Sequence, residues 1–360
     1  MKRLMTSGTV QSMSASHRGY VLGLVAAFSF GISAPLSKRL LGELDSAQLL
    51  AGLLYLGAFA ALAVASPFRR TGREARLRRG DLPGLAAMVA SGGIAAPVLL
   101  LIGLQRLSGA NASLLLNLEG PFTLLLAVAV AGEYLDRRAA IGAAAIFAGG
   151  VVLTGVDPSV SRSLTGALYV AAACLLWAVD NNLTQRLTVR DPFMIVSAKT
   201  AVAGTVNMTV AIILGAGRPP AGVIASAVVL GAVSYGLSVL ADAYALRLLG
   251  AAREAAVFAL APFLGALIAV PMLHEHLGRA QLIAAVAMAG GVALMVSERH
   301  RHRHRHQRLE HDHAHVHDAH HQHAHVGDVP IDVPHAHPHD HEPLEHAHRH
   351  VSDVHHRHDH

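Results

Sequence analysis

Residues 82–104 read LPGLAAMVASGGIAAPVLLLIGL, a continuous run without a charged side chain. A helix of about 20 mostly apolar residues crosses the hydrocarbon core of a bilayer. Backbone polar groups in lipid must be satisfied internally, so a spanning segment is either a helix or part of a closed barrel. Because the apolar residues are continuous rather than alternating, the run predicts a membrane-spanning helix.

The rest of the chain extends this pattern. It is 52% hydrophobic and only 15% charged, whereas soluble globular proteins have about 25% charged residues. This composition does not fit a water-soluble enzyme, and we predict an all-α membrane protein with ten transmembrane helices. The predicted spans are residues 19–37, 46–66, 82–104, 110–131, 138–156, 164–183, 193–214, 220–240, 251–272 and 279–297.

The positive-inside rule gives the expected orientation. With residues 1–18 placed in the cytoplasm, fifteen Lys and Arg residues lie on the inner side of the spans and six on the outer side. An even number of spans returns the C-terminus to the same side, so both termini are expected to be cytoplasmic. Residues 4–18 lack the compact apolar stretch of a signal peptide.

Several short motifs occur twice. Residues 106–110 read RLSGA and residues 247–251 read RLLGA, an offset of 141 residues; the pairs Pro121-Phe122 and Pro262-Phe263 share it. Glycine pairs follow in the next span of each half, and a glutamate (Glu133, Glu275) ends each proline-containing span. Five spans per repeat is an odd number, so the halves at 19–156 and 164–297 must cross the membrane in opposite orientations. Such inverted repeats are typical of alternating-access carriers, with the substrate site between the halves.

These paired halves and motifs resemble the EamA-type drug/metabolite transporter superfamily over roughly residues 19–297. The resemblance implies a ten-helix secondary carrier of a bacterial-type inner membrane, with both termini inside. It also implies amino acids, metabolites or toxic compounds as substrates, and export as the expected direction. Residues 298–360 lie outside the resemblance.

Ionisable groups within membrane spans are functional candidates, because burying a charge in lipid is costly. Glu119 lies two residues before Pro121, which removes a backbone hydrogen bond, and shares its span with Asn111 and Asn117. Burial favours the neutral carboxyl, the condition for proton coupling. Glu119 is therefore the favoured coupling group, and Pro121 and Pro262 are predicted hinges. The alternative is a structural hydrogen bond between helices.

A second candidate site comprises Asp180, Asn181 and Lys199. The sixth span runs inward and the seventh runs outward, so Asp180 and Lys199 should lie at similar depth and form an ion pair that gates the inner mouth. Solvation of the helix end and snorkelling of the lysine are the alternatives. Glu254 opens the ninth span, where it is expected to complement the helix dipole, and Trp177 is expected to serve packing or interface anchoring.

The tail at residues 298–360 holds 23 of the 26 histidines and few large apolar residues, so we expect it to be disordered without metal. Neutral imidazoles suit Ni, Co, Zn and Cu. A pH-responsive tail that binds the anionic inner leaflet and a low-complexity tail without function are the alternatives. The predicted metal ligands are His311, His313, His315, His317, His320, His321, His323, His325, His335, His337, His339 and His341.

The function that fits best is secondary transport of small organic metabolites or drugs, by an exporter whose tail binds metal. The alternatives are a divalent-metal efflux transporter fed by the tail and a membrane-tethered metal buffer without transport. Neither a P-loop nor HExxH or GxSxG occurs, so we expect no enzyme and no required cofactor. The single cysteine excludes an internal disulfide. The expected partners are the lipid bilayer and a small-molecule substrate; the arginine-rich loop 67–80 fits lipid headgroups rather than nucleic acid, and a homo-oligomer is compatible with the sequence.

Overall fold

The computed structural model has ten helical segments that are long and apolar enough to cross a membrane, within the residues that it describes. This confirms the all-helical fold class. The described residues are 5–68, 77–131, 135–155, 160–187, 190–249, 251–297, 300–305, 309–315, 335–341 and 345–350.

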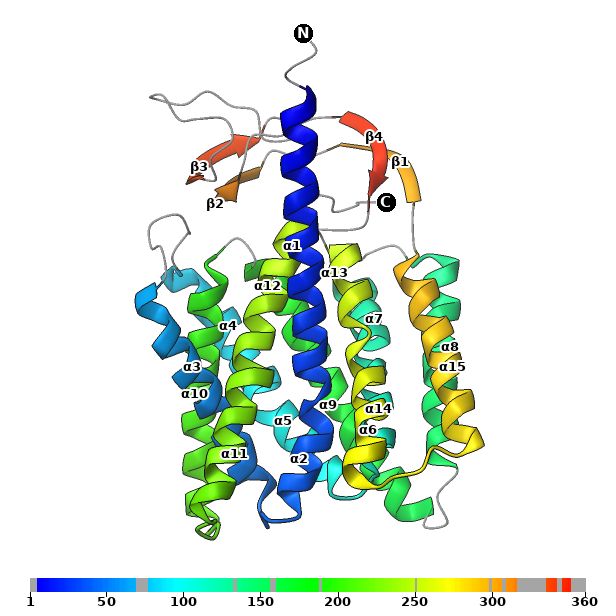
Figure 1. Cartoon of the computed structure of the whole chain (residues 1–360). Coiled ribbons are helices and arrows are strands. Elements are labelled where there is room, and N and C mark those ends of the chain that lie inside the picture. Colours follow the sequence, from blue (N-terminus) through cyan, green and yellow to red (C-terminus); the bar gives the residue numbers. More distant parts are fainter. Residues whose placement is uncertain are drawn as a thin grey trace.

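The first five spans alternate in direction through the bundle (Figure 1). Most begin at a polar cap: Ser46 and Ser108 each accept a backbone N–H three residues later, as N-caps do. The elements are α1 (Met5–Gly31), α2 (Ser33–Leu41), α3 (Ala47–Ala65), η1 (Ser66–Phe68), η2 (Arg79–Asp81), α4 (Leu82–Met88), η3 (Val89–Ala95), α5 (Ala96–Leu104), α6 (Gly109–Leu115), η4 (Leu116–Leu118), α7 (Glu119–Ala131) and α8 (Arg137–Thr154).

The second five spans repeat this arrangement. Asp191 caps the seventh span by accepting the N–H of Phe193, with Pro192 at the first helical position. The elements are α9 (Val160–Leu187), α10 (Pro192–Ile213), α11 (Ala221–Gly231), η5 (Ala232–Leu237), α12 (Ser238–Leu249), α13 (Ala251–Phe258), α14 (Ala261–Leu273) and α15 (Arg279–Val296).

The two halves pack against each other symmetrically. Each second, fourth and fifth span packs on its counterpart, as α3 on α10, α6 on α14 and α8 on α15. Each first span packs on the third span of the other half, as α1 on α12 and α9 on α5. The first span of each half thus contacts the third span of the other half, and the second, fourth and fifth spans contact their counterparts. This symmetric set of contacts fits an inverted repeat.

Glycine allows several of these helices to touch backbone to backbone, as small residues do in membrane proteins. A Cβ built on Gly231 of α11 would lie 1.9 Å from the Leu54 carbonyl oxygen of α3, and one on Gly57 of α3 would lie 2.2 Å from the Val228 oxygen. The surface towards lipid is apolar instead: Val151, Ile213 and Val286 are exposed by 70%, 76% and 74%.

The third and the fourth span of each half have an irregular turn about halfway along. In the third span of each half the turn is π-helical, η3 and η5, and such turns often occur at functional sites. In the fourth span of each half the α-helix is interrupted just before Pro121 and Pro262, by η4 in one half and by residues 259–260 in the other.

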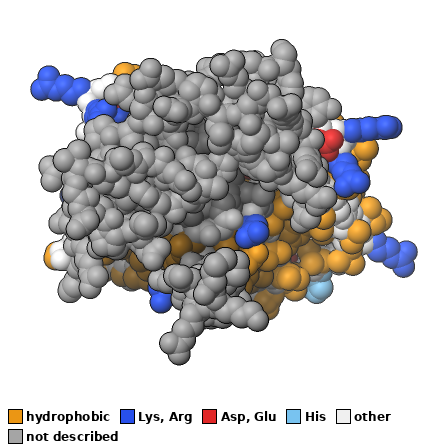
Figure 2. All heavy atoms as spheres, turned by 90° about the horizontal axis from the view of Figure 1, so that it is seen from above, with side chains coloured by type: hydrophobic (Ala, Val, Ile, Leu, Met, Phe, Trp, Pro, Cys, Tyr) orange, Lys and Arg blue, Asp and Glu red, His pale blue; other side chains and the backbone are white. Residues whose placement is uncertain are grey.

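The N-terminal helix and the tail lie at the same end of the bundle (Figure 1). Figure 2, which views this end, shows Lys and Arg side chains around its rim. In the described part of the tail, β1 (His300–Arg305) pairs with β4 (Glu345–His350) and β2 (Leu309–His315) with β3 (His335–His341), both antiparallel. We did not expect this local pairing. Isolated two-stranded ladders are only marginally stable in water, so disorder of the metal-free tail stays a prediction.

Candidate functional site

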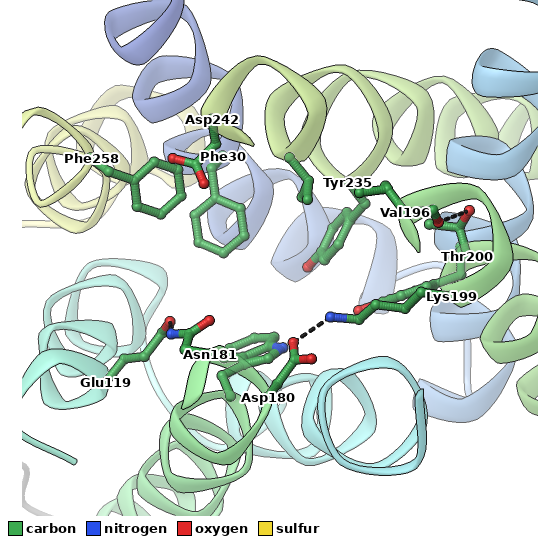
Figure 3. Close-up of a pocket in the computed structure, with 13 residues that line it drawn as sticks. Phe30, Glu119, Asp180, Asn181, Val196, Lys199, Thr200, Tyr235, Asp242 and Phe258 are labelled. Carbon is green, nitrogen blue, oxygen red and sulfur yellow. Dashed lines mark hydrogen bonds and ion pairs between the residues drawn. The ribbon is translucent and has the colours of Figure 1, made fainter. Parts of the chain in front are cut away.

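A cavity of about 130 Å³ lies in the middle of the bundle, between the two halves. Its wall combines aromatic rings with charged side chains (Figure 3). Residues from the first half are Phe30 (α1), Tyr55 (α3) and Glu119 (α7); residues from the second half are Trp177, Asp180 and Asn181 (α9), Val196, Lys199 and Thr200 (α10), Tyr235 (η5), Val239 and Asp242 (α12) and Phe258 (α13).

The Asp180–Lys199 ion pair lies on one wall of the cavity (Figure 3). The Lys199 ammonium donates to Asp180 Oδ2, and the two side chains are only 16% and 6% exposed. The second carboxylate oxygen of Asp180 has no hydrogen-bond partner among the described residues. The structure therefore brings this predicted pair together, and it leaves one buried acceptor that a ligand could use.

Glycine makes room for this pair. A Cβ on Gly92, in the π-helical turn η3, would lie 2.2 Å from Asp180 Oδ2. The carbonyl oxygen of Gly92 accepts two hydrogen bonds, from the Tyr55 hydroxyl at 2.9 Å and from the Trp177 indole at 3.0 Å. A π turn frees carbonyls from the regular helix ladder, and here the freed carbonyl positions two aromatic walls of the cavity.

Glu119 faces the cavity next to Asn181, whose amide nitrogen donates to the Glu119 carboxylate at 2.7 Å. The carboxylate thus has one hydrogen-bond partner from the other half. Glu119 is the first residue of α7, at the interruption of the span. Its equivalent at the offset of 141 is Leu260, so the carboxylate occurs in one half only.

Asn111 and Asn117 do not line this cavity, although they share the fourth span with Glu119. Asn117 is buried and donates to the carbonyl of Leu114 in its own helix, at 2.9 Å. Asn111 is also buried, and its side-chain oxygen has no partner among the described residues. Two residues correspond to about 200° around a helix, so Asn117 points away from the cavity that Glu119 faces.

Two acidic residues belong to this region although the sequence did not single them out as a site. Asp242 lines the cavity, and its carboxyl is in hydrogen-bond contact with the carboxyl of Glu254. We expected Glu254 to complement the helix dipole; it does lie in the first turn of α13, and it is also buried, with only 9% exposed. Asp242 fell beyond the predicted end of its span, residue 240, whereas the helical span continues to Leu246.

An aromatic cluster surrounds Phe30. Its ring centroid lies 5.4 Å from Phe258, 6.1 Å from Tyr235 and 6.4 Å from Trp177, and the last two contacts are edge-to-face. Aromatic rings in such arrangements stabilise one another beyond their burial. Trp177 is thus part of the cavity wall rather than an interface anchor.

Glu275 has a structural function that the sequence did not reveal. Its carboxylate accepts the backbone N–H groups of Gly109 and Ala110, at 2.6 and 2.8 Å. These amides open α6 and lack partners within the helix. Glu275 therefore caps a helix of the other half and ties the two halves together at the end remote from the termini.

The described part of the tail holds some of the predicted metal ligands. The antiparallel register of β2 and β3 places His311 opposite His339, His313 opposite His337 and His315 opposite His335. The other predicted ligands, His317, His320, His321, His323 and His325, lie outside the described residues. Within the described residues, no three His, Cys, Asp or Glu residues are placed to hold a metal ion.

Comparison with known proteins places these observations in context. Residues 17–155 and 164–297 each match the model of the EamA-like transporter family. The chain is 31% identical to an "Uncharacterized transporter" of Methanothermobacter thermautotrophicus, over 77% of this chain and 85% of that protein. It is 29% identical to a "Probable terminal-alkyne amino-acid exporter" of Streptantibioticus cattleyicolor, over 61% of this chain and 75% of that protein.

A solved crystal structure has a similar fold. It superposes with a TM-score of 0.57, is 20% identical in sequence, and matches 78% of this chain and 95% of that chain. The two family matches coincide with the two halves predicted from the sequence repeat.

Proposed function

The chain belongs to the EamA-like transporter family, and we propose that it exports small organic metabolites or drugs across a bacterial-type inner membrane by alternating access. The observation that carries this proposal is the central cavity, whose wall is shared by both halves. Carriers built from inverted repeats bind their substrates at this place. Both termini are taken to be cytoplasmic, because both lie at the same end of the bundle (Figure 1) and arginines surround that end (Figure 2).

The chemistry of the wall favours a substrate with an amino group. Among the described residues that line the cavity, Glu119, Asp180 and Asp242 face the single cation Lys199, which is a formal balance of −2 with every group ionised. Carboxylates and aromatic faces both attract an ammonium group. Lys199 supplies a cation for a substrate carboxylate, and the Phe30 cluster accommodates an apolar side chain. Together these groups suit a small apolar amino acid, the compound class in the name of the Streptantibioticus relative.

Glu119, Asp180 and Lys199 each have a defined part in this proposal. Glu119 and Asn181 bind the substrate amino group, and the buried, unpartnered oxygen of Asp180 adds an acceptor when the pair opens. The Asp180–Lys199 pair opens when the substrate carboxylate competes for Lys199, so substrate binding loosens the contact between α9 and α10. The interruptions before Pro121 and Pro262 provide the hinges.

Exchange of radiolabelled leucine in proteoliposomes tests this function. Vesicles loaded with unlabelled leucine should take up label, and Glu119→Gln and Lys199→Met should slow the exchange. Glu43→Gln, a change at an exposed acid between the first two spans, is the matched control. Competition by unlabelled alanine, leucine and phenylalanine measures the size that the cavity accepts. Exchange no faster than in protein-free vesicles, for every proteinogenic amino acid, would refute an amino-acid substrate.

We also propose that the tail binds divalent transition metals through its histidines. The supporting observation is the facing backbone register of three histidine pairs in β2 and β3. Imidazole ligands suit nickel, cobalt, zinc and copper, so the tail serves as a metal buffer or sensor beside the carrier.

Metal efflux through the bundle is the competing function. It is tested by the total nickel, cobalt, zinc and copper content of cells that express the full chain, a chain ending at Ser297, or Glu119→Gln, at equal membrane levels. Retained metal that follows the tail and ignores Glu119 supports a buffer. Lower content of one metal, lost in Glu119→Gln, would instead identify metal efflux.

A further inference from the structure

Two carboxyl groups, of half-buried Asp242 and buried Glu254, meet at the edge of the central cavity, where α12 packs on α13. Asp242 lines the cavity, and Figure 3 shows it beside Phe30 and Phe258, across from Glu119 and Asn181. Its carboxyl is in hydrogen-bond contact with that of Glu254. Two carboxylates repel each other and neither can donate, so this contact requires a proton on one of them.

Each carboxyl group of the pair has one oxygen without a hydrogen-bond partner among the described residues, and a shared proton could bind there. Glu254 is only 9% exposed, and its Oε1 has no hydrogen-bond partner among the described residues; the same is true of Asp242 Oδ1. Unpartnered buried acceptors are costly, and a shared proton satisfies one of them directly.

Charged and titratable groups on the neighbouring elements do not neutralise the pair. Among the described side chains, Lys199 on α10 is bound to Asp180, and Arg253 on α13 is exposed. On α1 the titratable groups are exposed: His17, Arg18 and Tyr20. The remaining described groups are Tyr235 in η5, Tyr244 on α12, Glu119 across the cavity and Arg279 at the opposite end of α15. The side chain of Arg247 on α12 lies outside the described residues.

We infer that Asp242 and Glu254 hold one proton between them and that the release of this proton to water drives the transport cycle. The inference rests on the proposed transport function. It assigns proton coupling to this pair rather than to Glu119, because Glu119 already accepts a hydrogen bond from Asn181.

The position of the pair explains how a proton could move helices. Asp242 lies just after the π turn η5, and Glu254 lies on the half-helix α13 that ends before the interruption at residues 259–260. When the proton leaves for water, two carboxylates remain in contact and repel each other, which separates α12 from α13 at these two weak points. When a proton returns from the other side, the contact closes again.

The proton site belongs to one half of the bundle. At the offset of 141 residues, the equivalents of Asp242 and Glu254 are Leu101 and Ser113, which cannot serve as carboxyl partners. Proton exchange therefore biases only the movement of α12 against α13, and not the matching movement in the first half.

Infrared spectroscopy of the purified full chain tests the shared proton without any substrate. Protonated carboxyl groups have a carbonyl stretch that is separate from that of carboxylates. At neutral pH the double variant Asp242→Asn/Glu254→Gln should lose the intensity of one protonated carboxyl. Glu43→Gln should lose none, and Glu119→Gln shows whether that residue contributes. An Asn–Gln pair retains both a donor and an acceptor, so the fold should survive, and size-exclusion chromatography checks this.

A transport measurement then tests coupling. Exchange of neutral leucine for one proton moves one charge, so the membrane potential is held at zero. With a pH difference of about one unit across the vesicle membrane, a one-for-one exchanger then accumulates leucine about tenfold, since one pH unit is a tenfold ratio of protons. Glu254→Gln, whose side chain is not among those that line the cavity, should lose this accumulation and still exchange leucine without a gradient.

The outcomes separate the two proposals. Unchanged infrared intensity in the double variant would overturn the shared proton, whatever the transport result. Loss of the band with accumulation still near tenfold would overturn its coupling role. Absence of leucine exchange in the unmodified chain would refute the leucine substrate, while the infrared result still decides whether the pair holds a proton.

Discussion

Substitution of Gly231 by alanine should destabilise the bundle far more than the same change at Gly290. Gly231 lies where α11 crosses α3, and an added Cβ would lie 1.9 Å from the Leu54 carbonyl oxygen. Gly290 lies on α15, where a Cβ meets nothing within 4 Å. Both glycines belong to helices, so the two variants share the change in helix propensity and differ in contact.

The structure gives the size of the effect. Ordinary van der Waals contact begins at 3.4 Å, so α11 would have to move about 1.5 Å away from α3, the difference between 3.4 and 1.9 Å. Backbone atoms cannot rotate aside as a side chain does, so we take the upper end of the overpacking range, about 3 kcal/mol. At Gly290 alanine should stabilise the helix by up to about 1 kcal/mol. The gain in helix propensity is common to both variants, so they should differ by the contact cost alone, which is about 6 °C in melting temperature at roughly 2 °C per kcal/mol.

The single tryptophan provides the assay. Trp177 is 7% exposed at the cavity wall, so its fluorescence should shift when the bundle opens on heating in detergent. Size-exclusion profiles after heating provide a second readout that does not depend on the cavity. Equal melting temperatures for Gly231→Ala and Gly290→Ala would refute the backbone contact between α3 and α11.

Three further predictions concern the charges and the tail. Lys199→Met should cost about 3–5 kcal/mol of stability, because it leaves a buried carboxylate without a partner. Thermal melting should show recovery when Asp180→Asn is added. Equal loss in the single and double variants would mean that the pair contributes nothing. Glu275→Ala should cost about 0.5–2 kcal/mol, as loss of an N-cap does, and should speed hydrogen exchange at the start of α6, whereas unchanged exchange would contradict the cap. Ending the chain at Ser297 should abolish zinc binding in isothermal calorimetry and leave leucine exchange intact; zinc binding that survives would place a metal site in the bundle.

The fold was largely predictable because the membrane imposes simple rules on sequence. Ten apolar runs, an odd number of spans per repeat and an offset of 141 residues sufficed to predict two inverted halves. The helix directions also placed Asp180 and Lys199 at one depth, and the structure joins them in an ion pair.

The rest of the site depended on features that are not visible in residue spacing. Asp242 was missed because its span is longer than the apolar run suggests. Asn117 was grouped with Glu119 because both occur on one span, but they face different directions around the helix. The capping role of Glu275 depends on the approach of the other half, and no local pattern records that contact.

The paired π turns also bear on how this protein arose. η3 begins ten residues into the third span, and η5 begins eleven residues into its counterpart. A π turn holds one more residue than a regular turn, and one insertion before duplication explains both more simply than two separate insertions afterwards. On this count the irregular turn is older than the duplication that produced the two halves. Glu119, Asp242 and Glu254, whose counterparts are Leu260, Leu101 and Ser113, distinguish one half from the other. Both halves thus share the irregular backbone and differ in the ionisable side chains placed around it.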